Sequence, residues 1–383
     1  MPEEKVKNKI WNLKLFSSRG GIDVPFFVLA VALLAFGLIM MFSASYAYAY
    51  YHEKGDSYFY IKKQLVFAAV GFIAMIAASF MDYHWWRVLA LPIMGVSVAL
   101  LVIVLFLPDQ ANVRRWINLG FFGFQPSEIA KFAMIILFAH FISLNYKRMD
   151  TFAYGVLPYS LVLGLISVLL LLEPHISCTV IVITIGLIMM FVGGTKLRYF
   201  GILGGTVVAG LTAVILSGKI SYAMSRLDVW INPWSDPQGK GWQNIQALYA
   251  IGSGGFLGLG LGNSRQKYLY ISEPQTDFVF AVICEELGYI GAVLIIVLFG
   301  LLVWRGFVIG LKSKDKLGLL IAIGLTAQVG IQAALNIAVV TKLIPNTGIS
   351  LPFFSYGGTS LMMLLAQMGV VLSVSRSARL VKV

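Results

Sequence analysis

The stretch Ile271-Ser-Glu-Pro-Gln-Thr-Asp277-Phe-Val-Phe-Ala-Val-Ile-Cys-Glu285-Glu286-Leu-Gly288 joins a long polar loop to a strongly apolar segment. Three carboxylates, Asp277, Glu285 and Glu286, lie at the start of this segment or inside it. An ionisable group is costly inside hydrocarbon, so each one calls for a specific role. Asp277 lies at the expected helix start, where unpaired backbone N–H groups favour a carboxylate. Two interpretations of Asp277 are therefore open, a helix cap and a catalytic base that faces a polar cavity.

The composition indicates a polytopic membrane protein. Of the 383 residues, 59% are hydrophobic and only 12% are charged, whereas soluble domains carry about 25% charged residues. The 29 Lys and Arg exceed the 17 Asp and Glu, which gives a net charge of +12. Basic cytoplasmic loops account for such an excess, and no basic soluble module points to nucleic acid as a partner. The two cysteines lie in apolar segments, which argues against a disulfide framework.

Ten apolar segments are long enough to span a membrane, since a spanning helix needs about 20 residues. They cover residues 24–46, 64–81, 88–107, 127–143, 154–172, 176–193, 200–217, 278–303, 317–341 and 358–374. We therefore expect an all-α protein with about ten transmembrane helices. No internal repeat or separate soluble domain is evident, so residues 24–375 are expected to form a single membrane domain.

The charge pattern predicts that both termini are cytoplasmic. Residues 1–23 form a basic N-terminal tail, residues 376–383 form a basic C-terminal tail, and alternate loops between the segments are also basic. The positive-inside rule places all of these in the cytoplasm, with the chain in the cytoplasmic membrane. The long loop 218–276, between helices 7 and 8, is then extracytoplasmic. Two shorter polar loops, 111–120 and 345–358, share that face, so a site is expected there.

Two polar stretches, 114–116 and 125–131, surround the start of the fourth segment. Glu128 and Lys131 are three residues apart and therefore share a helix face. One interpretation is a self-neutralised pair, with Arg115 as an interfacial anchor. The other is that Arg115 and Lys131 present positive charge to a diphosphate, whose oxygens match the guanidinium fork.

The loop before Asp277 is rich in glycine from Gly252 to Gly262, and Arg265 and Lys267 follow directly. The glycines superficially match nucleotide-binding patterns, but no strand precedes them, so nucleotide binding is not indicated. Glycine backbone can approach a phosphate closely. The alternative is a segment in which small residues simply permit close packing.

Two further breaks in the apolar pattern are open to more than one interpretation. Glu173-Pro174-His175 marks either a turn or a broken helix that lines a cavity. No second His or Cys lies at metal-ligand spacing from His175, so a zinc-type site is not supported. The loop 345–358, rich in proline and glycine, is expected to form a rigid turn at the membrane surface.

Together these segments resemble the SEDS family (shape, elongation, division and sporulation), which includes FtsW, RodA and SpoVE. The loop 345–358 is nearest to the FtsW and SpoVE branch. The matching pieces occur in family order and are Arg115-Trp116-Ile117, Gln125-Pro-Ser-Glu-Ile-Ala-Lys131, Glu173-Pro174, Gly241-Trp-Gln243, Glu273-Pro-Gln-Thr-Asp277-Phe-Val-Phe-Ala, Glu285-Glu286-Leu-Gly288 and Leu351-Pro-Phe-Phe-Ser-Tyr-Gly-Gly358.

The resemblance implies a ten-helix peptidoglycan glycosyltransferase that polymerises lipid II at the outer face of the cytoplasmic membrane, in cell division or sporulation. It also implies a class B penicillin-binding protein, a transpeptidase, as partner, beside other division or elongation proteins. Asp277 matches the essential aspartate of the family. Many relatives have Gln-Pro-Asp where this chain has Glu173-Pro174-His175, so Glu173 is not counted in the site. The expected substrate or diphosphate contacts are Arg115, Glu128, Lys131, Gln243, Arg265, Lys267 and Ser355.

The chemistry of this reaction suits the residues. The donor carries a diphosphate leaving group, so no nucleotide is needed, and a carboxylate such as Asp277 can take the proton of the acceptor hydroxyl. Positive charge at the diphosphate comes from basic side chains or from a divalent cation, Mg²⁺ or Mn²⁺; the sequence leaves the metal requirement open. Two alternatives are a lipid II flippase, whose charges are spread through the membrane, and a non-catalytic scaffold that recruits a transpeptidase.

Overall fold

The structure is a computed structural model that describes residues 20–107, 115–118, 123–201, 204–205, 229–239 and 241–378. The regular structure in these ranges is almost all helical, as the sequence predicts. Within them the strands are a single short pair, β1 (Ile117–Asn118) and β2 (Gly123–Phe124). The two strands are antiparallel, with Ile117 opposite Phe124.

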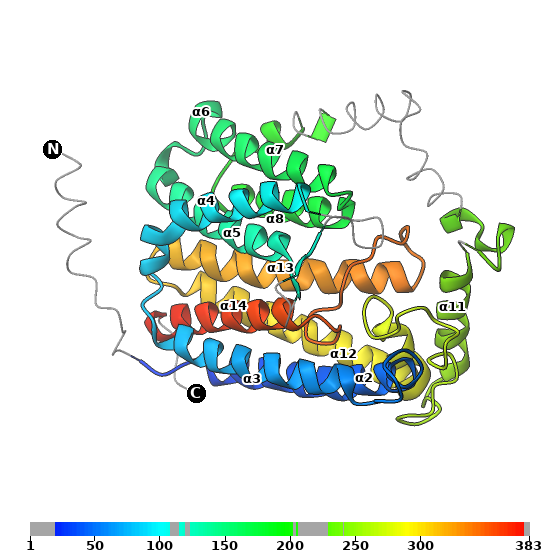
Figure 1. Cartoon of the computed structure of the whole chain (residues 1–383). Coiled ribbons are helices and arrows are strands. Elements are labelled where there is room, and N and C mark those ends of the chain that lie inside the picture. The colour runs from blue at the N-terminus through cyan, green and yellow to red at the C-terminus, as the bar shows by residue number, and fades with distance from the viewer. Residues whose placement is uncertain are drawn as a thin grey trace.

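The long helices lie side by side in a bundle (Figure 1). Their bounds are α2 (Val24–His52), α3 (Phe59–Phe80), α4 (Trp85–Leu105), α5 (Pro126–Asn145), α7 (Leu157–Leu172), α8 (Ile176–Val192), α12 (Val279–Leu311), α13 (Lys316–Val340) and α14 (Gly358–Ser377). The short elements are η1 (Tyr146–Arg148), α6 (Phe152–Gly155), η2 (Pro233–Ser235) and α11 (Trp242–Gly254).

Eight helical segments among the described residues are long and apolar enough to cross a membrane, so the expected polytopic membrane fold is confirmed. The sixth predicted segment corresponds to α8, which has only 17 residues. The seventh, 200–217, lies almost wholly outside the described residues. Three predicted boundaries were short by five residues or more, because α2 continues to His52, α3 begins at Phe59 and α12 continues to Leu311. The added parts of α2 and α3 are rich in polar and aromatic residues, which lower the mean hydropathy, and the added part of α12 begins with Trp304 and Arg305.

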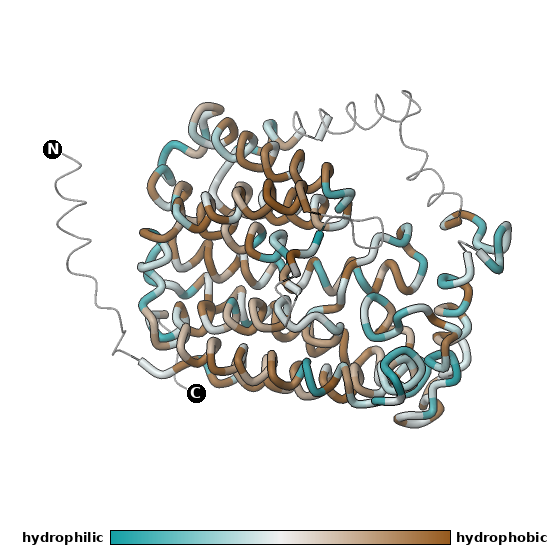
Figure 2. Tube along the Cα trace, in the orientation of Figure 1, coloured by the Kyte–Doolittle hydropathy of each residue, from teal (hydrophilic) through white to brown (hydrophobic). Residues whose placement is uncertain are grey.

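The bundle has two distinct ends. At the end where α2 begins and α14 finishes, which we call the terminal end, the backbone N–H of Asp23 donates to Ser375 Oγ at 3.0 Å. The Asp23 carboxylate also pairs with Arg305 of α12 at 2.8 Å. At the opposite, loop end lie α11 and the polar segments that follow it (Figure 1). Figure 2 shows hydrophilic residues at both ends of the bundle, most extensively at the loop end, with hydrophobic helices between the two ends.

Three helices form the centre of the bundle. In the most apolar 18-residue stretch of α5, α13 and α14, between 67% and 72% of the residues are buried, against 28% in the corresponding stretch of α3 and α4. The outer helices therefore present their apolar side chains to lipid, while α5, α13 and α14 pack against protein on most sides. Polar groups on these three central helices are hidden from lipid, and the start of α5, the start of α14 and the last turns of α13 meet at the loop end.

Candidate active site

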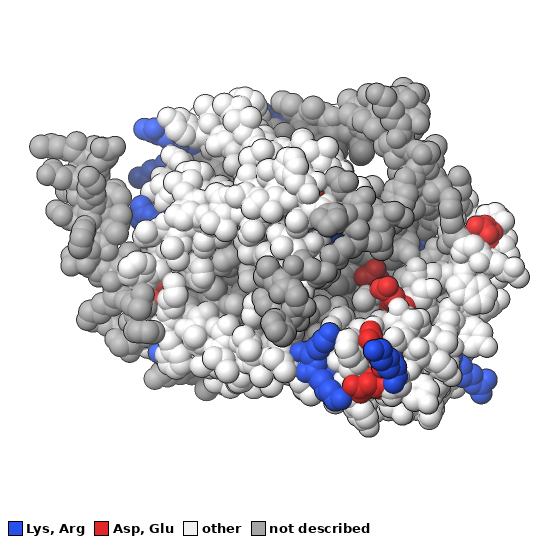
Figure 3. Space-filling view, viewed as in Figure 1, with Lys and Arg blue, Asp and Glu red and all other residues white. Residues whose placement is uncertain are grey.

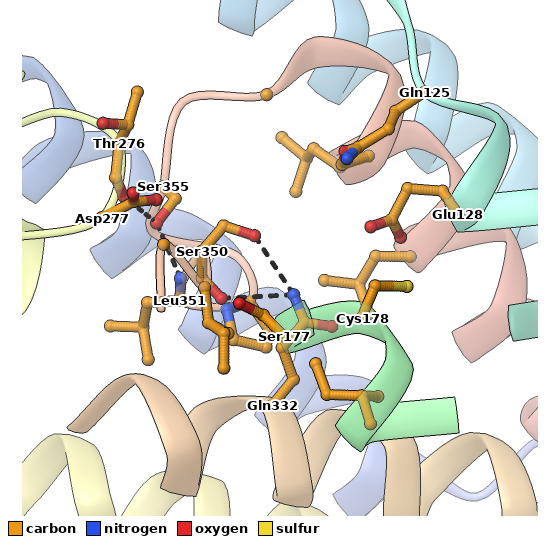
Figure 4. A pocket seen from close by; sticks show the side chains of 18 of the residues that line it. Gln125, Glu128, Ser177, Cys178, Thr276, Asp277, Gln332, Ser350, Leu351 and Ser355 are labelled. Carbon is orange, nitrogen blue, oxygen red and sulfur yellow. Dashed lines mark hydrogen bonds between the residues drawn. The ribbon is translucent and has the colours of Figure 1, made fainter. Parts of the chain in front are cut away.

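A pocket of about 320 Å³ lies at the loop end, among the central helices and the polar loops that cover them (Figure 4). This volume is typical of sites that bind small molecules. Segments far apart in the sequence contribute to it. Its polar lining residues are Arg115, Gln125, Glu128, Lys131, His175, Ser177, Glu273, Thr276, Asp277, Gln328, Gln332, Ser350, Ser355, Tyr356 and Ser360.

Asp277 lies on the wall of the pocket and immediately outside α12. The N-cap of α12 is Phe278, so Asp277 is not the cap of this helix. Its backbone carbonyl accepts a hydrogen bond of 2.9 Å from the Asn336 side-chain amide in α13. On the facing loop, a Cβ at Gly348 would lie 3.2 Å from Asp277 Oδ2, and Gly348 has a φ of +65° that disfavours other residues. Glycine at position 348 therefore allows the loop to pass close to the carboxylate.

Ser355 joins the loop 345–357 to the segment that carries Asp277. Its hydroxyl donates to the carbonyl of Thr276 and accepts the backbone N–H of Leu351 at 2.7 Å. The next residue, Tyr356, donates its backbone N–H to the carbonyl of Gln275 at 2.7 Å. These bonds fix the two loops against each other directly before Asp277.

Lys131 lies at the base of the pocket with its entire side chain buried, at 2% exposure. Its ammonium donates to Glu128 at 2.8 Å and to the side-chain oxygen of Gln332 at 3.2 Å. The Gln332 amide in turn donates to the carbonyl and hydroxyl oxygens of Ser350. The expected pair between Glu128 and Lys131 is therefore present. Hydrogen bonds through Gln332 extend this pair from α5 across α13 to Ser350, in the loop that faces Asp277.

Arg115 brings a second basic side chain to the pocket. Its guanidinium donates to the backbone carbonyls of Glu173 and Pro174 at the break between α7 and α8. The Glu173 carboxyl is fully buried, and no described residue forms a hydrogen bond with it. Burial raises the pKa of Glu173 to about 8, and the nearby charge of Arg115 partly opposes this shift. Burial, with Arg115 and Lys131 nearby, lowers the pKa of His175 to about 3, so this imidazole is neutral at pH 7.

Comparison with known proteins assigns the chain to a family. A family model described as "Cell cycle protein", for FtsW, RodA and SpoVE, matches residues 24–380. The chain belongs to the FtsW/RodA/SpoVE family. It is 42% identical to Stage V sporulation protein E of Bacillus subtilis (strain 168), over 93% of this chain and 98% of that protein. It is 40% identical to the probable peptidoglycan glycosyltransferase FtsW of Trichlorobacter lovleyi, over 94% of each chain.

Solved structures of this family have the same architecture. A chain from a study titled "Structural coordination of polymerization and crosslinking by a peptidoglycan synthase complex" matches with a TM-score of 0.76 and 28% identity, over 93% of this chain and 98% of that chain. The rod shape determining protein RodA of Thermus thermophilus matches with a TM-score of 0.68 and 27% identity, over 94% of this chain and 98% of that one.

The structure separates the residues that the family resemblance grouped together. Asp277, Arg115, Glu128, Lys131 and Ser355 all line the pocket. Three other expected contacts do not line it and are held elsewhere at the loop end. They are Gln243, Arg265 and Lys267. The Gln243 amide donates to the carbonyl of Ser272 at 3.0 Å, and the Lys267 ammonium pairs with Glu286 at 2.8 Å. Their contact with substrate stays a prediction.

The adjacent carboxylates of Glu285 and Glu286 are fully buried in α12 and do not line the pocket. Glu286 accepts from both Ser43 of α2 and Lys267. Glu285 accepts from the Ser264 hydroxyl and from the backbone N–H of Arg265. The two carboxylates therefore anchor the loop that follows the glycine-rich segment.

The glycine-rich segment packs directly on α12. A Cβ at Gly258 would lie 2.2 Å from the carbonyl oxygen of Glu286, and one at Gly254 would lie 2.0 Å from that of Cys284. The backbone N–H groups of Leu259 and Gly260 donate to the carbonyls of Glu285 and Glu286 at 3.0 Å. This geometry supports the interpretation in which small residues permit close packing.

A polar stripe on α13 was not expected from the sequence. Gln328, Gln332 and Asn336 are spaced four residues apart, so they lie on one helix face. Gln328 and Gln332 line the pocket, and Asn336 holds the backbone of Asp277. The signal was present in the sequence, because three amides at this spacing are unusual in an apolar segment. Charged residues are a clear signal in an apolar segment, whereas these amides carry no charge and are a weaker signal.

A divalent cation would need oxygen ligands. Among the described residues, no group of three or more His, Cys, Asp and Glu side chains is arranged to hold a metal ion. Three carboxylates line the pocket, and of these Asp277 and Glu273 could hold a cation together with substrate oxygens, since Glu128 is paired with Lys131. The requirement for Mg²⁺ or Mn²⁺ stays a prediction.

Proposed function

We propose that this chain is a peptidoglycan glycosyltransferase that polymerises lipid II, with Asp277 as the general base. The observation that carries the proposal is the pocket in which the Asp277 carboxylate shares one cavity with the cations of Arg115 and Lys131. Relatives whose names include this activity are 37–40% identical to the chain over most of its length. The role in the cell is septal synthesis during division or synthesis during sporulation.

The reaction needs a base and a stabiliser of the leaving group. Asp277 takes the proton of the acceptor sugar hydroxyl as its oxygen attacks the anomeric carbon of the donor. A glycosidic bond forms, the bond between that carbon and the lipid diphosphate breaks, and the electron pair leaves with the diphosphate. A positioned general base contributes about 10²–10⁴-fold to such a rate. An α-linked donor that gives a β-linked product needs no covalent intermediate, so one base suffices.

The cations of the pocket suit a departing diphosphate. Arg115 lies at the rim, where β1 begins, and its fork of N–H donors matches phosphate oxygens. Lys131 lies deeper and is partly neutralised by Glu128 at 2.8 Å. In a cavity shielded from water, fixed donors stabilise developing negative charge without reorganisation. Glu128 and Gln332 hold the Lys131 ammonium in place for this role.

A flippase is the main alternative, and the distribution of charge argues against it. A transport path needs polar groups through the membrane thickness. Among the described residues, the buried carboxylates Glu285 and Glu286 of α12 are bonded to loop residues and to Ser43 and are not free to form such a path. The charged residues of the pocket all lie at the loop end. This arrangement supports chemistry at one membrane face.

The proposal includes a location and partners. The loop end faces outward from the cytoplasmic membrane, and both termini are cytoplasmic. A class B penicillin-binding protein crosslinks the glycan, and other division or elongation proteins recruit the pair. A similar chain comes from a study of a peptidoglycan synthase complex, which supports a synthase partner.

The test uses the purified protein, its candidate class B partner and labelled lipid II. The native complex is expected to make long glycan strands, and Asp277→Asn is expected to lose about 10²–10⁴-fold in rate. The matched control is Asp150→Asn, since Asp150 forms an exposed pair with Lys196 outside the pocket. Equal polymer from native protein and Asp277→Asn would remove Asp277 from the chemistry, whereas lipid II crossing vesicles without polymer would support the flippase.

A further inference from the structure

Aromatic side chains form a continuous row at the loop end of α2 and α3. The ring of Tyr48 stacks on His52 with 4.1 Å between centroids. Tyr48 also contacts Tyr60 of α3 at 6.1 Å, and Tyr60 contacts Tyr356 at 4.9 Å in an edge-to-face pair. We call His52, Tyr48, Tyr60 and Tyr356 the aromatic row.

One end of the aromatic row is a wall of the pocket. Tyr356 lines the pocket, and its backbone N–H donates to Gln275 at 2.7 Å, two residues before Asp277. From there the row leads out of the pocket to His52, which is exposed, while the three tyrosines are half-buried. Each tyrosine therefore keeps part of its surface accessible at this end of the molecule.

A carboxylate accompanies the aromatic row. The Tyr60 hydroxyl donates to Glu53 Oε1 at 3.3 Å, and the Glu53 side chain is partly exposed. Lys62 and Lys63 lie on the first turn of α3 and are exposed. Figure 3 shows basic and acidic side chains gathered over this end of the molecule, next to a hollow that acidic side chains border. The surface thus combines apolar ring faces with hydrogen-bonding groups of both kinds.

An aromatic belt at the membrane interface is the ordinary explanation for tyrosines at a helix end. Four neighbouring tyrosines fit it, since their exposed fractions are between 43% and 63%; they are Tyr46, Tyr50, Tyr51 and Tyr58. The aromatic row differs from them in two respects. It is continuous with the pocket. In addition, the phenol of Tyr60 contacts the Glu53 carboxylate, whose negative charge would repel anionic lipid headgroups.

We propose that the aromatic row and Glu53 form a subsite for the glycan strand that leaves or enters the pocket. A pyranose ring has an apolar C–H face that packs on an aromatic ring, while its hydroxyl and N-acetyl groups bond to phenols and carboxylates. Because consecutive sugars need consecutive contacts, a row suits a strand better than a single sugar. The subsite rests on the proposed polymerase function, and it adds a means of keeping the strand bound between additions.

The first measurement is binding of preformed, uncrosslinked glycan strands of defined length to the purified protein by microscale thermophoresis. Tyr48→Ala and Tyr60→Ala are expected to weaken binding about three- to tenfold each, the size of a lost aromatic contact. Tyr51→Ala is the matched control, since Tyr51 is 63% exposed and outside the row; its affinity should be native. Glu53→Gln should weaken binding less, because only a charge is removed.

The second measurement is the length of the strands that the same variants make from labelled lipid II with the class B partner. Tyr60→Ala is expected to shorten them, whereas Tyr51→Ala should give strands of native length. The binding measurement uses preformed strands, so its result does not depend on whether this chain polymerises lipid II. Native affinity in Tyr48→Ala and Tyr60→Ala, with each variant folded by its melting temperature, would overturn the subsite. An equal loss in Tyr51→Ala would identify the tyrosines as an interfacial belt.

Discussion

The Asn336 side-chain amide lies 2.9 Å from the carbonyl oxygen of Asp277, although the two residues are 59 positions apart in the sequence. The same amide donates to the carbonyl of Ile349 at 2.6 Å. One side chain of α13 therefore fixes both the segment that carries the proposed base and the loop that faces it. This makes Asn336 a positioning residue, because it acts on the reaction through Asp277.

Asn336→Ala is expected to lower the turnover of lipid II polymerisation by about ten- to a hundredfold, with a smaller change in KM. Two buried carbonyls lose their donor, which costs about 1–3 kcal/mol, and the carboxylate is no longer held in its productive position. The measurement is the initial rate as a function of lipid II concentration.

The control for this prediction is Asn145→Ala. Asn145 also donates its amide to a backbone carbonyl, that of Phe141 at 3.2 Å, but at the terminal end of α5. It should leave both constants unchanged. A change confined to KM in Asn336→Ala would show that Asn336 acts on substrate binding and not on the base.

The pair of Lys131 and Glu128 allows stability to be separated from activity. Lys131→Met leaves Glu128 without its partner at a largely buried site, and breaking such a pair costs about 3–5 kcal/mol. Lys131→Met with Glu128→Gln removes both charges and should recover most of the melting temperature. Polymerisation should stay low in the double variant, because the diphosphate still lacks the ammonium. Full activity in the stable double variant would assign Lys131 to structure alone.

The pair of Lys267 and Glu286 is expected to give the opposite result. Lys267 is 2% exposed and Glu286 is fully buried, with 2.8 Å between their charged atoms. Each of Lys267→Met and Glu286→Gln should lower the melting temperature, and the double variant should recover both stability and polymerisation. Breaking the exposed pair of Lys62 and Asp56 should change the melting temperature much less, since exposed pairs contribute about 0–1 kcal/mol. A stable double variant without activity would return Lys267 to the list of substrate contacts.

Glu173 predicts a pH dependence of stability. Its pKa is raised from 4.5 to about 8 in the folded protein by burial, so the folded state holds a proton that the unfolded state has lost between these values. The free energy of unfolding therefore falls as pH rises from about 4.5 to 8, with a slope of at most about 1.4 kcal/mol per pH unit. Above that range it is independent of this group.

Glu173→Gln tests this dependence, because the amide is neutral at every pH. The variant should lose less stability than the native protein between about pH 5 and pH 8, as measured by melting temperature in detergent. Glu273→Gln is the matched control, since Glu273 is exposed and its replacement should leave the slope unchanged. Identical slopes in native protein and Glu173→Gln would show that Glu173 is ionised in the folded state.

Much of the fold followed from the sequence, because hydrocarbon imposes one local rule on every spanning segment. Each backbone polar group must be paired within its own helix, and about 20 apolar residues are required. The spans of α2, α5 and α13 could therefore be located without knowing their neighbours. The polar breaks that hold Arg115 and Asp277 were visible for the same reason.

The sequence by itself determined that this is a helical membrane protein and that Asp277 stands where a polar loop meets an apolar helix. Only the tertiary structure decided which charged groups share the pocket with it. Lys131 faces the pocket beside Glu128, whereas Lys267, only ten positions before Asp277, is paired with Glu286. The choice of partner for a buried charge depends on which groups packing brings within about 3 Å, and spacing along the chain does not encode that distance.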